Sequence, residues 1–231
     1  MEPSFKHPRA LQPAQCPAYI LAGGRSSRFG SDKARVRCGA SPLLLVLRRT
    51  LIEHGHAVEI VADRADRYAD LGIECLVDWH AERGPLAAVA TALHHREQQQ
   101  SGWLLLLSCD LLVWREAWFE QLRAALQQFP SSANQAATAH EPETAEHVGS
   151  ERRELAGIAF ERLAAGGRQQ VEPFPSLLHS RLWPQAVALL GSQKRSLQSL
   201  FDHSSSLAIE TQDSPQAWTF NTAEQLRALL G

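Results

Sequence analysis

Apolar residues follow two different patterns along the first 130 positions of the chain. Short, mostly apolar runs, typical of strands, occupy residues 18–22, 57–62, 73–77 and 103–107, and the last of them is continuous, as in a strand covered on both faces. Longer segments with apolar residues every three or four positions predict helices over residues 42–54, 84–96 and 116–129. Pro85 marks the start of the second helix, because proline is tolerated in a first helical turn. The alternation predicts an α/β fold with a doubly wound, mostly parallel sheet flanked by helices.

The regular alternation ends at Pro130. Residues 131–154 are rich in Ser, Ala, Glu and His without an apolar period, so they predict a flexible insertion. The proline-containing residues 173–176 predict the start of a helix that carries the leucines at 177, 178 and 182. Other expected elements are a strand over 155–160, a turn at 166–167, a helix over 196–201, an extended segment over 207–211 and a last helix that starts within residues 221–224 and is capped by Asn221 or Thr222.

Length and composition limit the class of protein. The 231 residues fit one α/β domain over residues 17–231, preceded by a disordered tail over residues 1–16 that lacks the apolar core of a signal peptide. The longest apolar runs are too short to span a bilayer, so no membrane partner is expected. A net charge of −2 without a basic stripe argues against nucleic-acid binding. Four widely spaced cysteines predict free thiols and a cytoplasmic protein.

The richest candidate chemistry lies directly after the first apolar run. Residues 20–34 read Ile-Leu-Ala-Gly-Gly-Arg-Ser-Ser-Arg-Phe-Gly-Ser-Asp-Lys-Ala. Gly23 and Gly24 permit positive φ and a close approach of a ligand to the backbone, and Arg28 and Lys33 add positive charge. The spacing matches neither a P-loop nor the dinucleotide fingerprint. A plain structural turn and a polyphosphate-binding loop both remain compatible with the glycines alone.

A second candidate site is Ser108-Cys109-Asp110, at the end of the fourth apolar run. Ligands of open α/β sheets bind beyond the carboxyl ends of the strands, which is where Asp110 is expected. A carboxylate there can hold Mg²⁺ beside a phosphate, or it can merely cap the following segment. The residues alone do not separate these two interpretations.

The string Leu-Ala-Gly-Gly-x-Ser-x-Arg-[Met/Phe]-Gly-x-Asp-Lys, present at residues 21–33, resembles the nucleotide-binding loop of the molybdenum cofactor guanylyltransferases. These belong to a wider family of nucleotidyltransferases with a Rossmann-like fold. The resemblance implies nucleotide binding by Leu21, Ala22, Gly23 and Gly24, and phosphate binding by Arg28 and Lys33. It also implies that Asp110 holds Mg²⁺, although the family's Cys-Asp-x-Pro pattern has Leu112 in place of proline here.

Four weaker matches follow in the family's order. Asp78 and the pair Gly84-Pro85 match positions near the nucleotide, and backbone N–H groups over residues 21–24 together with Asp78 are candidates for recognising guanine. Arg195 and Ser196 match the acceptor half. Asn221 matches an asparagine that helps to hold the metal or the phosphates. The family's neighbouring asparagine and proline are replaced by Thr219 and Ala223.

The resemblance implies transfer of GMP from GTP to the terminal phosphate of molybdopterin, with release of pyrophosphate. Such a phosphate is already largely dianionic at neutral pH, because its second pKa is near ~6, so no enzyme nucleophile is needed. Expected partners are GTP, the molybdopterin acceptor and other cofactor-biosynthesis proteins. Two alternatives stay open: a sister nucleotidyltransferase with another nucleotide or acceptor, and a non-catalytic nucleotide-binding protein.

Overall fold

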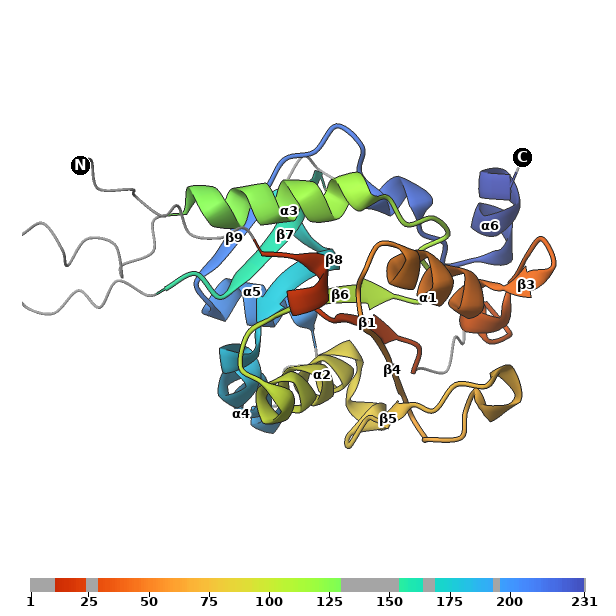
Figure 1. Ribbon diagram of the computed structural model, residues 1–231, viewed down its shortest axis with the longest axis horizontal. Coiled ribbons are helices and arrows are strands. Elements are labelled where there is room, and N and C mark those ends of the chain that lie inside the picture. The colour runs from red at the N-terminus through yellow and green to blue at the C-terminus, as the bar shows by residue number, and fades with distance from the viewer. Residues whose placement is uncertain (1–10, 24–28, 130–153, 164–168, 193–195, 231) are drawn as a thin grey trace, which may run out of the picture.

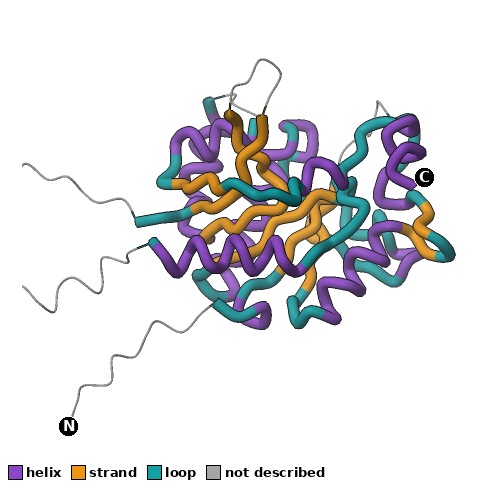
Figure 2. Tube along the Cα trace, turned by 90° about the horizontal axis from the view of Figure 1, so that it is seen from above, coloured by secondary structure: helices purple, strands orange, loops and turns teal. Residues whose placement is uncertain are grey.

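The computed structural model describes residues 11–23, 29–129, 154–163, 169–192 and 196–230. Its centre is a seven-stranded sheet in the order β5-β4-β1-β6-β8-β7-β9, with helices on both faces (Figure 1). Figure 2 shows the same strands from above, between helical layers. A separate two-stranded ribbon joins β2 (Arg37–Cys38) to β3 (Ser41–Pro42). The predicted α/β class is therefore confirmed.

The first half of the chain builds the parallel part of the sheet. β1 (Ala18–Leu21) lies between β4 (Val58–Ala62) and β6 (Trp103–Ser108), and it is parallel to both. β5 (Leu76–Val77) extends this part beyond β4, also in parallel. The predicted strand over 73–77 is thus only two residues long. Its first residue, Ile73, instead forms an isolated bridge to Tyr68.

The second half of the sheet is mixed. β8 (Gln169–His179) runs antiparallel to β6 and to β7 (Gly157–Leu163), and β9 (Ser206–Ile209) runs parallel to β7. The predicted helix over the leucines at 177, 178 and 182 is wrong, because the first two of them belong to β8. They pair with Leu105 and Leu104 of β6 and are fully buried on opposite faces.

A bulge in β8 explains why residues 173–176, which predicted a helix start, belong to a strand. Ala159 of β7 pairs with Ser176, whereas the next residue, Phe160, pairs with Glu172. The three residues between these partners, which include Pro173 and Pro175, therefore stand outside the regular ladder. Proline cannot donate to a ladder and is tolerated in a strand at such bulges. The prolines mark a bulge, and the following helix begins later, at Trp183.

Helices bury the two faces of the sheet separately. One apolar cluster joins α1 (Leu43–Glu53) and α3 (Glu116–Gln128) to one face, and α3 lies above the sheet in Figure 1. The other cluster joins α2 (Pro85–Gln99), α4 (Trp183–Gly191) and α5 (Leu197–His203) to the opposite face. Alternate residues of β1 divide between these clusters, as the two-residue period of a strand requires.

The last helix, α6 (Ala223–Leu230), begins as predicted. The Thr222 hydroxyl accepts from the Gln225 N–H at 3.2 Å, and the Gln225 side chain accepts from the Thr222 N–H at 3.1 Å. This reciprocal pair is a capping box that satisfies backbone donors at the helix start. α6 therefore has its own start signal, directly after Asn221.

Ordered structure also precedes residue 17. Pro13–Gln15 forms a 3-10 helix, and Cys16 is fully buried, so the domain begins earlier than the boundary expected from sequence. Residues 1–10 and most of the expected insertion, residues 130–153, lie outside the described residues. All four cysteines are free thiols. Within the described parts of the chain, none of the helices is both long and apolar enough to span a membrane.

Candidate functional site

Three residues predicted from sequence meet at one point beyond the carboxyl end of β6. The Lys33 ammonium donates to Asp110 Oδ2 at 3.0 Å and to Asn221 Oδ1 at 2.8 Å. Lys33 lies in the 3-10 helix η2 (Lys33–Arg35), Asp110 follows β6 and Asn221 precedes α6. The side chains of Lys33 and Asp110 are only 12% and 18% exposed, so water screens their attraction less than at an open surface.

Backbone pairing explains how Asn221 reaches Asp110. The Leu112 N–H donates to the Trp218 carbonyl at 2.8 Å, and the Phe220 N–H donates to the Asp110 carbonyl at 3.2 Å. Between these bonds, Leu111 and Thr219 form an antiparallel bridge. The segment before α6 is thus paired directly with the segment after β6.

The departures from the family pattern fit this pairing. A proline at position 112 has no N–H and would not donate to the Trp218 carbonyl, whereas Leu112 does. Thr219 lies in the bridge and donates its hydroxyl to the Gln216 carbonyl at 3.0 Å. Ala223 is the first residue of α6 and lies next to the capping residue Thr222. The three replacements are therefore compatible with the contact between Asp110 and Asn221.

The oxygen donors at this point suit a hard divalent cation. A carboxylate oxygen of Asp110 and an amide oxygen of Asn221 already converge on one cation, the Lys33 ammonium. No cluster of three or more His, Cys, Asp or Glu that could hold a metal occurs among the described residues. Mg²⁺ commonly takes only one or two carboxylates and completes its shell with water and substrate phosphates. The oxygens of Asp110 and Asn221 therefore suit the Mg²⁺ that the family resemblance implies, and their role as its ligands stays a prediction.

The neighbouring thiol is not an activated nucleophile. Cys109 lies between β6 and Asp110, and its N–H donates to the Leu21 carbonyl at 3.1 Å. Burial raises the pKa of the Cys109 thiol to about 12, with the nearby Asp110 charge adding to the effect. The thiol therefore stays neutral at physiological pH, whereas a nucleophilic cysteine needs a lowered pKa.

The start of the glycine-rich segment is buried and close to β4. Leu21 and Ala22 are 6% and 3% exposed, and the Ala22 N–H donates to the Val61 carbonyl at 2.9 Å. That N–H is therefore paired within the sheet, and recognition of guanine by the other N–H groups of residues 21–24 stays a prediction. Gly23 does not use the positive φ that glycine permits, and a Cβ there would lie 3.4 Å from the Ala62 Cα. Gly24 and Arg28 lie outside the described residues.

The predicted nucleotide residues Asp78, Gly84 and Pro85 connect β5 to α2. Asp78 is 8% exposed, and its Oδ1 accepts from the His80 N–H at 2.9 Å. Burial raises the pKa of its carboxyl above the ordinary value. Gly84 has φ 81°, a conformation that side chains disfavour, and Pro85 is the first residue of α2. Gly84 and Pro85 thus have a structural role in starting the helix.

The acceptor residues predicted from sequence are described in part. Ser196 is the N-cap of α5, and its hydroxyl accepts from the Gln198 N–H at 3.1 Å. Arg195 lies outside the described residues. The role of both residues in binding an acceptor stays a prediction.

An interaction network that no sequence motif indicates lies beside Lys33. The Asp32 carboxylate binds Arg67 at 3.1 Å, and Tyr68 donates to the Ala22 carbonyl at 2.9 Å. Arg35 forms a two-point ion pair with Asp70 at 2.7 and 2.9 Å. Asp32 stood in the recognised string, but the segment that carries Arg67 and Tyr68 has neither a motif nor an apolar period. No signal in the single sequence points to these two residues.

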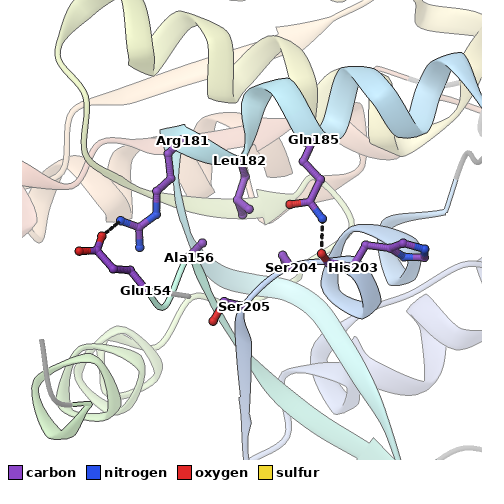
Figure 3. Close-up of a pocket in the computed structure, with 8 residues that line it drawn as sticks. All are labelled: Glu154, Ala156, Arg181, Leu182, Gln185, His203, Ser204 and Ser205. Carbon is purple, nitrogen blue, oxygen red and sulfur yellow. Dashed lines mark hydrogen bonds and ion pairs between the residues drawn. The ribbon is translucent and has the colours of Figure 1, made fainter. Parts of the chain in front are cut away.

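A separate cavity of about 530 Å³ lies where β7 and β9 begin (Figure 3). Figure 3 shows Arg181 reaching toward Glu154, with 2.6 Å between Nη1 and Oε2, and Gln185 directed at the His203 carbonyl, to which it donates. These polar groups are thus paired within the protein. The strands start here, at the opposite edge of the sheet from Asp110, so this cavity is distinct from the Lys33 site. It is lined by Glu154, Ala156, Arg181, Leu182, Gln185, His203, Ser204 and Ser205.

The chain is similar in sequence to proteins named molybdenum cofactor guanylyltransferase. A protein of Synechococcus elongatus named probable molybdenum cofactor guanylyltransferase is 38% identical over 115 residues, which is 46% of this chain and 57% of that protein. The chain therefore spans little more than half the length of that relative. A protein of Photobacterium profundum named molybdenum cofactor guanylyltransferase is 25% identical over 211 residues, covering 90% and 92% of the two chains.

Solved structures and a family model extend the comparison. Molybdopterin-guanine dinucleotide biosynthesis protein A from Archaeoglobus fulgidus has a TM-score of 0.66 at 13% identity, over 92% of this chain and 96% of that one. The bifunctional IspDF of Campylobacter jejuni has a TM-score of 0.62 at 14% identity, over 93% and 54% of the chains. Both likenesses concern the fold alone. The family model for the MobA-like NTP transferase domain matches residues 18–208, and the chain therefore belongs to the MobA-like NTP transferase family.

Proposed function

We propose that the chain is a Mg²⁺-dependent nucleotidyltransferase that transfers GMP from GTP to the terminal phosphate of molybdopterin and releases pyrophosphate. The proposal rests on one observation: the Lys33 ammonium contacts both Asp110 and Asn221 beyond the carboxyl ends of the parallel strands. The three residues are far apart in the sequence. In the structure, the ammonium of Lys33 is held between the oxygens of Asp110 and Asn221. The family and the names of the relatives supply the substrate class.

The proposed reaction needs positioning and charge neutralisation. An oxygen of the acceptor phosphate forms a bond to the α-phosphorus of GTP, and the bond from that phosphorus to the bridging oxygen of pyrophosphate breaks. The acceptor phosphate is already largely dianionic, since its second pKa is near ~6. No general base is therefore required, which agrees with the neutral Cys109 thiol beside the site.

Among the described residues, Lys33 is the cation that lies at the Asp110–Asn221 contact, where the triphosphate is expected. Its ammonium carries three N–H donors, of which the contacts to Asp110 and Asn221 use two. A preorganised cation in a half-buried site stabilises developing negative charge more strongly than one in water. Asp110 and Asn221 would hold Mg²⁺, which supplies further neutralisation of the phosphate oxygens when bound.

Pyrophosphate release tests the proposal directly. The purified protein is incubated with molybdopterin, Mg²⁺ and each of GTP, CTP, ATP and UTP, and nucleotide affinities are measured by calorimetric titration. We expect release with GTP that requires the acceptor. Release with another nucleotide would instead identify a sister enzyme. GTP binding without release would identify a non-catalytic nucleotide-binding protein.

The proposed reaction belongs in the cytoplasm, where a reducing environment keeps thiols free. All four cysteines of the chain are free thiols, which is consistent with that compartment. Cell fractionation of the tagged protein would check the location, and recovery outside the cytoplasmic fraction would contradict it.

A further inference from the structure

The Tyr68 hydroxyl lies between two segments that flank the glycine-rich stretch. It is 2.9 Å from the Ala22 carbonyl oxygen, before the stretch, and 3.1 Å from Asp32 Oδ2, after it. The phenol is fully buried. A hydroxyl carries one proton, so the carbonyl and the carboxylate share a single donor. One buried side chain thereby connects the end of β1 with the residue that precedes Lys33.

Asp32 also determines the position of Lys33, because its side chain caps the helix that begins at Lys33. Its Oδ1 accepts from the Ala34 N–H at 3.0 Å and so caps the short helix η2, of which Lys33 is the first residue. Its Oδ2 is 3.1 Å from Arg67 Nη2, and Arg67 Nη1 is 2.6 Å from Asp63 Oδ1. The position of the carboxylate therefore sets where the helix begins and where the lysine side chain starts.

The surroundings keep Tyr68 in its donor form. Burial raises the pKa of the Tyr68 phenol, and the neighbouring Asp32 charge raises it further. The guanidinium groups of Arg35 and Arg67 lie 5.2 and 5.7 Å from the centroid of the Tyr68 ring. Such cation–π contacts hold the ring in place when the groups are sheltered from water. The phenol thus stays protonated and fixed in orientation.

We propose that Tyr68 is a positioning residue for the nucleotide: its hydroxyl fixes Ala22 relative to Asp32 and thereby places Lys33 for the triphosphate before the nucleotide binds. This inference rests on the proposed function, because it assigns Tyr68 a part in nucleotide affinity. A tyrosine that only fills the core would contribute through packing, and its hydroxyl would not influence the ligand. Preorganisation of a binding site improves affinity by reducing the ordering cost at the moment of binding.

The test compares two tyrosines that differ in location. Tyr68→Phe removes the shared hydroxyl and keeps the ring. Tyr19→Phe is the matched control, because Tyr19 is also fully buried and its hydroxyl is 2.9 Å from His95 Nδ1, away from Lys33. The melting temperature, the Kd for GTP and the KM and kcat of pyrophosphate release are measured for both variants. We expect similar small losses in melting temperature, but a Kd and a KM for GTP raised about tenfold only in Tyr68→Phe, equivalent to one net hydrogen bond.

Hydrogen exchange gives a readout that needs no ligand. We expect backbone amides of the peptide covering residues 20–35 to exchange faster in nucleotide-free Tyr68→Phe than in wild type or in Tyr19→Phe. Unchanged exchange, or faster exchange with unchanged nucleotide affinity, would overturn the inference.

The proposed function is judged separately, on the wild-type protein. If wild type prefers another nucleoside triphosphate over GTP, the proposed function fails, and the Tyr68 comparison is made with that nucleotide. If wild type binds none of the four triphosphates, both the proposed function and the inference are wrong.

Discussion

At the scale of single residues, the Lys33 ammonium balances the charge of Asp110 in the structure and is expected to balance triphosphate charge during the reaction. Replacing Lys33 by Ala removes this preorganised cation. We expect turnover with GTP to fall by on the order of 10²-fold or more, the scale of losing one electrostatic group in a catalytic site. Steady-state pyrophosphate release measures the effect. The fold should survive, because the side chain lies in a short loop helix outside the apolar clusters.

A second charge deletion controls for nonspecific effects of charge. Arg64→Ala removes a cation that is 66% exposed and pairs with Asp66 at the surface. We expect near-normal turnover for Arg64→Ala. Near-normal turnover for Lys33→Ala as well would show that the phosphate assignment is wrong.

Asp110 is expected to attract Mg²⁺ by its charge. Asp110→Asn keeps the size of the side chain and leaves the backbone bond from Phe220 intact, but it removes the negative charge. We expect activity that is weak or needs much higher Mg²⁺, as measured by titrating Mg²⁺ in the pyrophosphate assay. Asp70→Asn, at an exposed carboxylate paired with Arg35, should leave the Mg²⁺ dependence unchanged. A lower melting temperature with unchanged Mg²⁺ dependence in Asp110→Asn would make Asp110 purely structural.

Asp78 is the candidate for choosing guanine over adenine. A buried carboxylate can accept from the N1–H and N2 donors of guanine, which adenine does not present in the same arrangement. We expect Asp78→Ala to weaken GTP binding more than any residual ATP binding, measured by calorimetry. Asp78→Asn keeps an acceptor for the His80 N–H. It therefore separates the effect of losing this hydrogen bond from the effect of losing the charge. Equal losses for both nucleotides would place Asp78 at the ribose or outside the site.

At the scale of elements, β8 places a buried carboxyl beside the site. Glu172 is 9% exposed, and burial raises the pKa of its carboxyl to about 7; Arg162 at 3.8 Å opposes this effect and Asp110 adds to it. A pKa raised on folding favours the protonated form. The contribution of the protonated Glu172 carboxyl to the free energy of unfolding is therefore fully present below the ordinary pKa of 4.5. This contribution is lost as pH rises through about 7.

Glu172→Gln tests this dependence, because glutamine stays neutral at every pH. We expect the free energy of unfolding of wild type, relative to the variant, to decrease between pH 4.5 and 7 and then to level off. Denaturant unfolding at closely spaced pH values measures the difference. Glu53→Gln, at a side chain that is 64% exposed, is the matched carboxyl control. A difference between wild type and Glu172→Gln that is independent of pH would contradict the assignment.

Local patterns predicted those elements whose signals are local. The strands at β1, β4 and β6 and the helices α1, α2 and α3 were confirmed close to their expected limits. β8 was missed because its identity depends on pairing with β6 and on the bulge that admits Pro173 and Pro175. Short motifs pointed to Lys33, Asp110 and Asn221, and the structure brings these side chains into contact, while their roles stay predictions. Tyr68 was missed because its role depends on where Ala22 and Asp32 lie in space.

At the scale of the whole molecule, the late segment around Trp218 completes the site through backbone bonds to the segment after β6. Leu112→Pro, which restores the family's residue, removes the N–H that donates to the Trp218 carbonyl. Leu112→Ala keeps that N–H and removes only the side chain. We expect Leu112→Pro to raise the Mg²⁺ requirement more than Leu112→Ala does, because Asn221 is then held less firmly near Asp110. Equal Mg²⁺ titration curves for the two variants would show that the bond does not support the site.

The separation of the site residues along the chain also has a consequence for synthesis on the ribosome. Asn221 is translated 188 residues after Lys33, and Asp110 only 77 residues after it. At common elongation rates of about 5–20 residues per second, the nascent chain carries Lys33 without Asn221 for roughly 10–40 s. The parallel strands and Asp110 can assemble during that interval, but Asn221, the second proposed oxygen ligand, is still missing. A partly synthesised chain is therefore expected to fold β1, β4, β5 and β6 before it can bind a metal-complexed triphosphate with all of the proposed ligands in place.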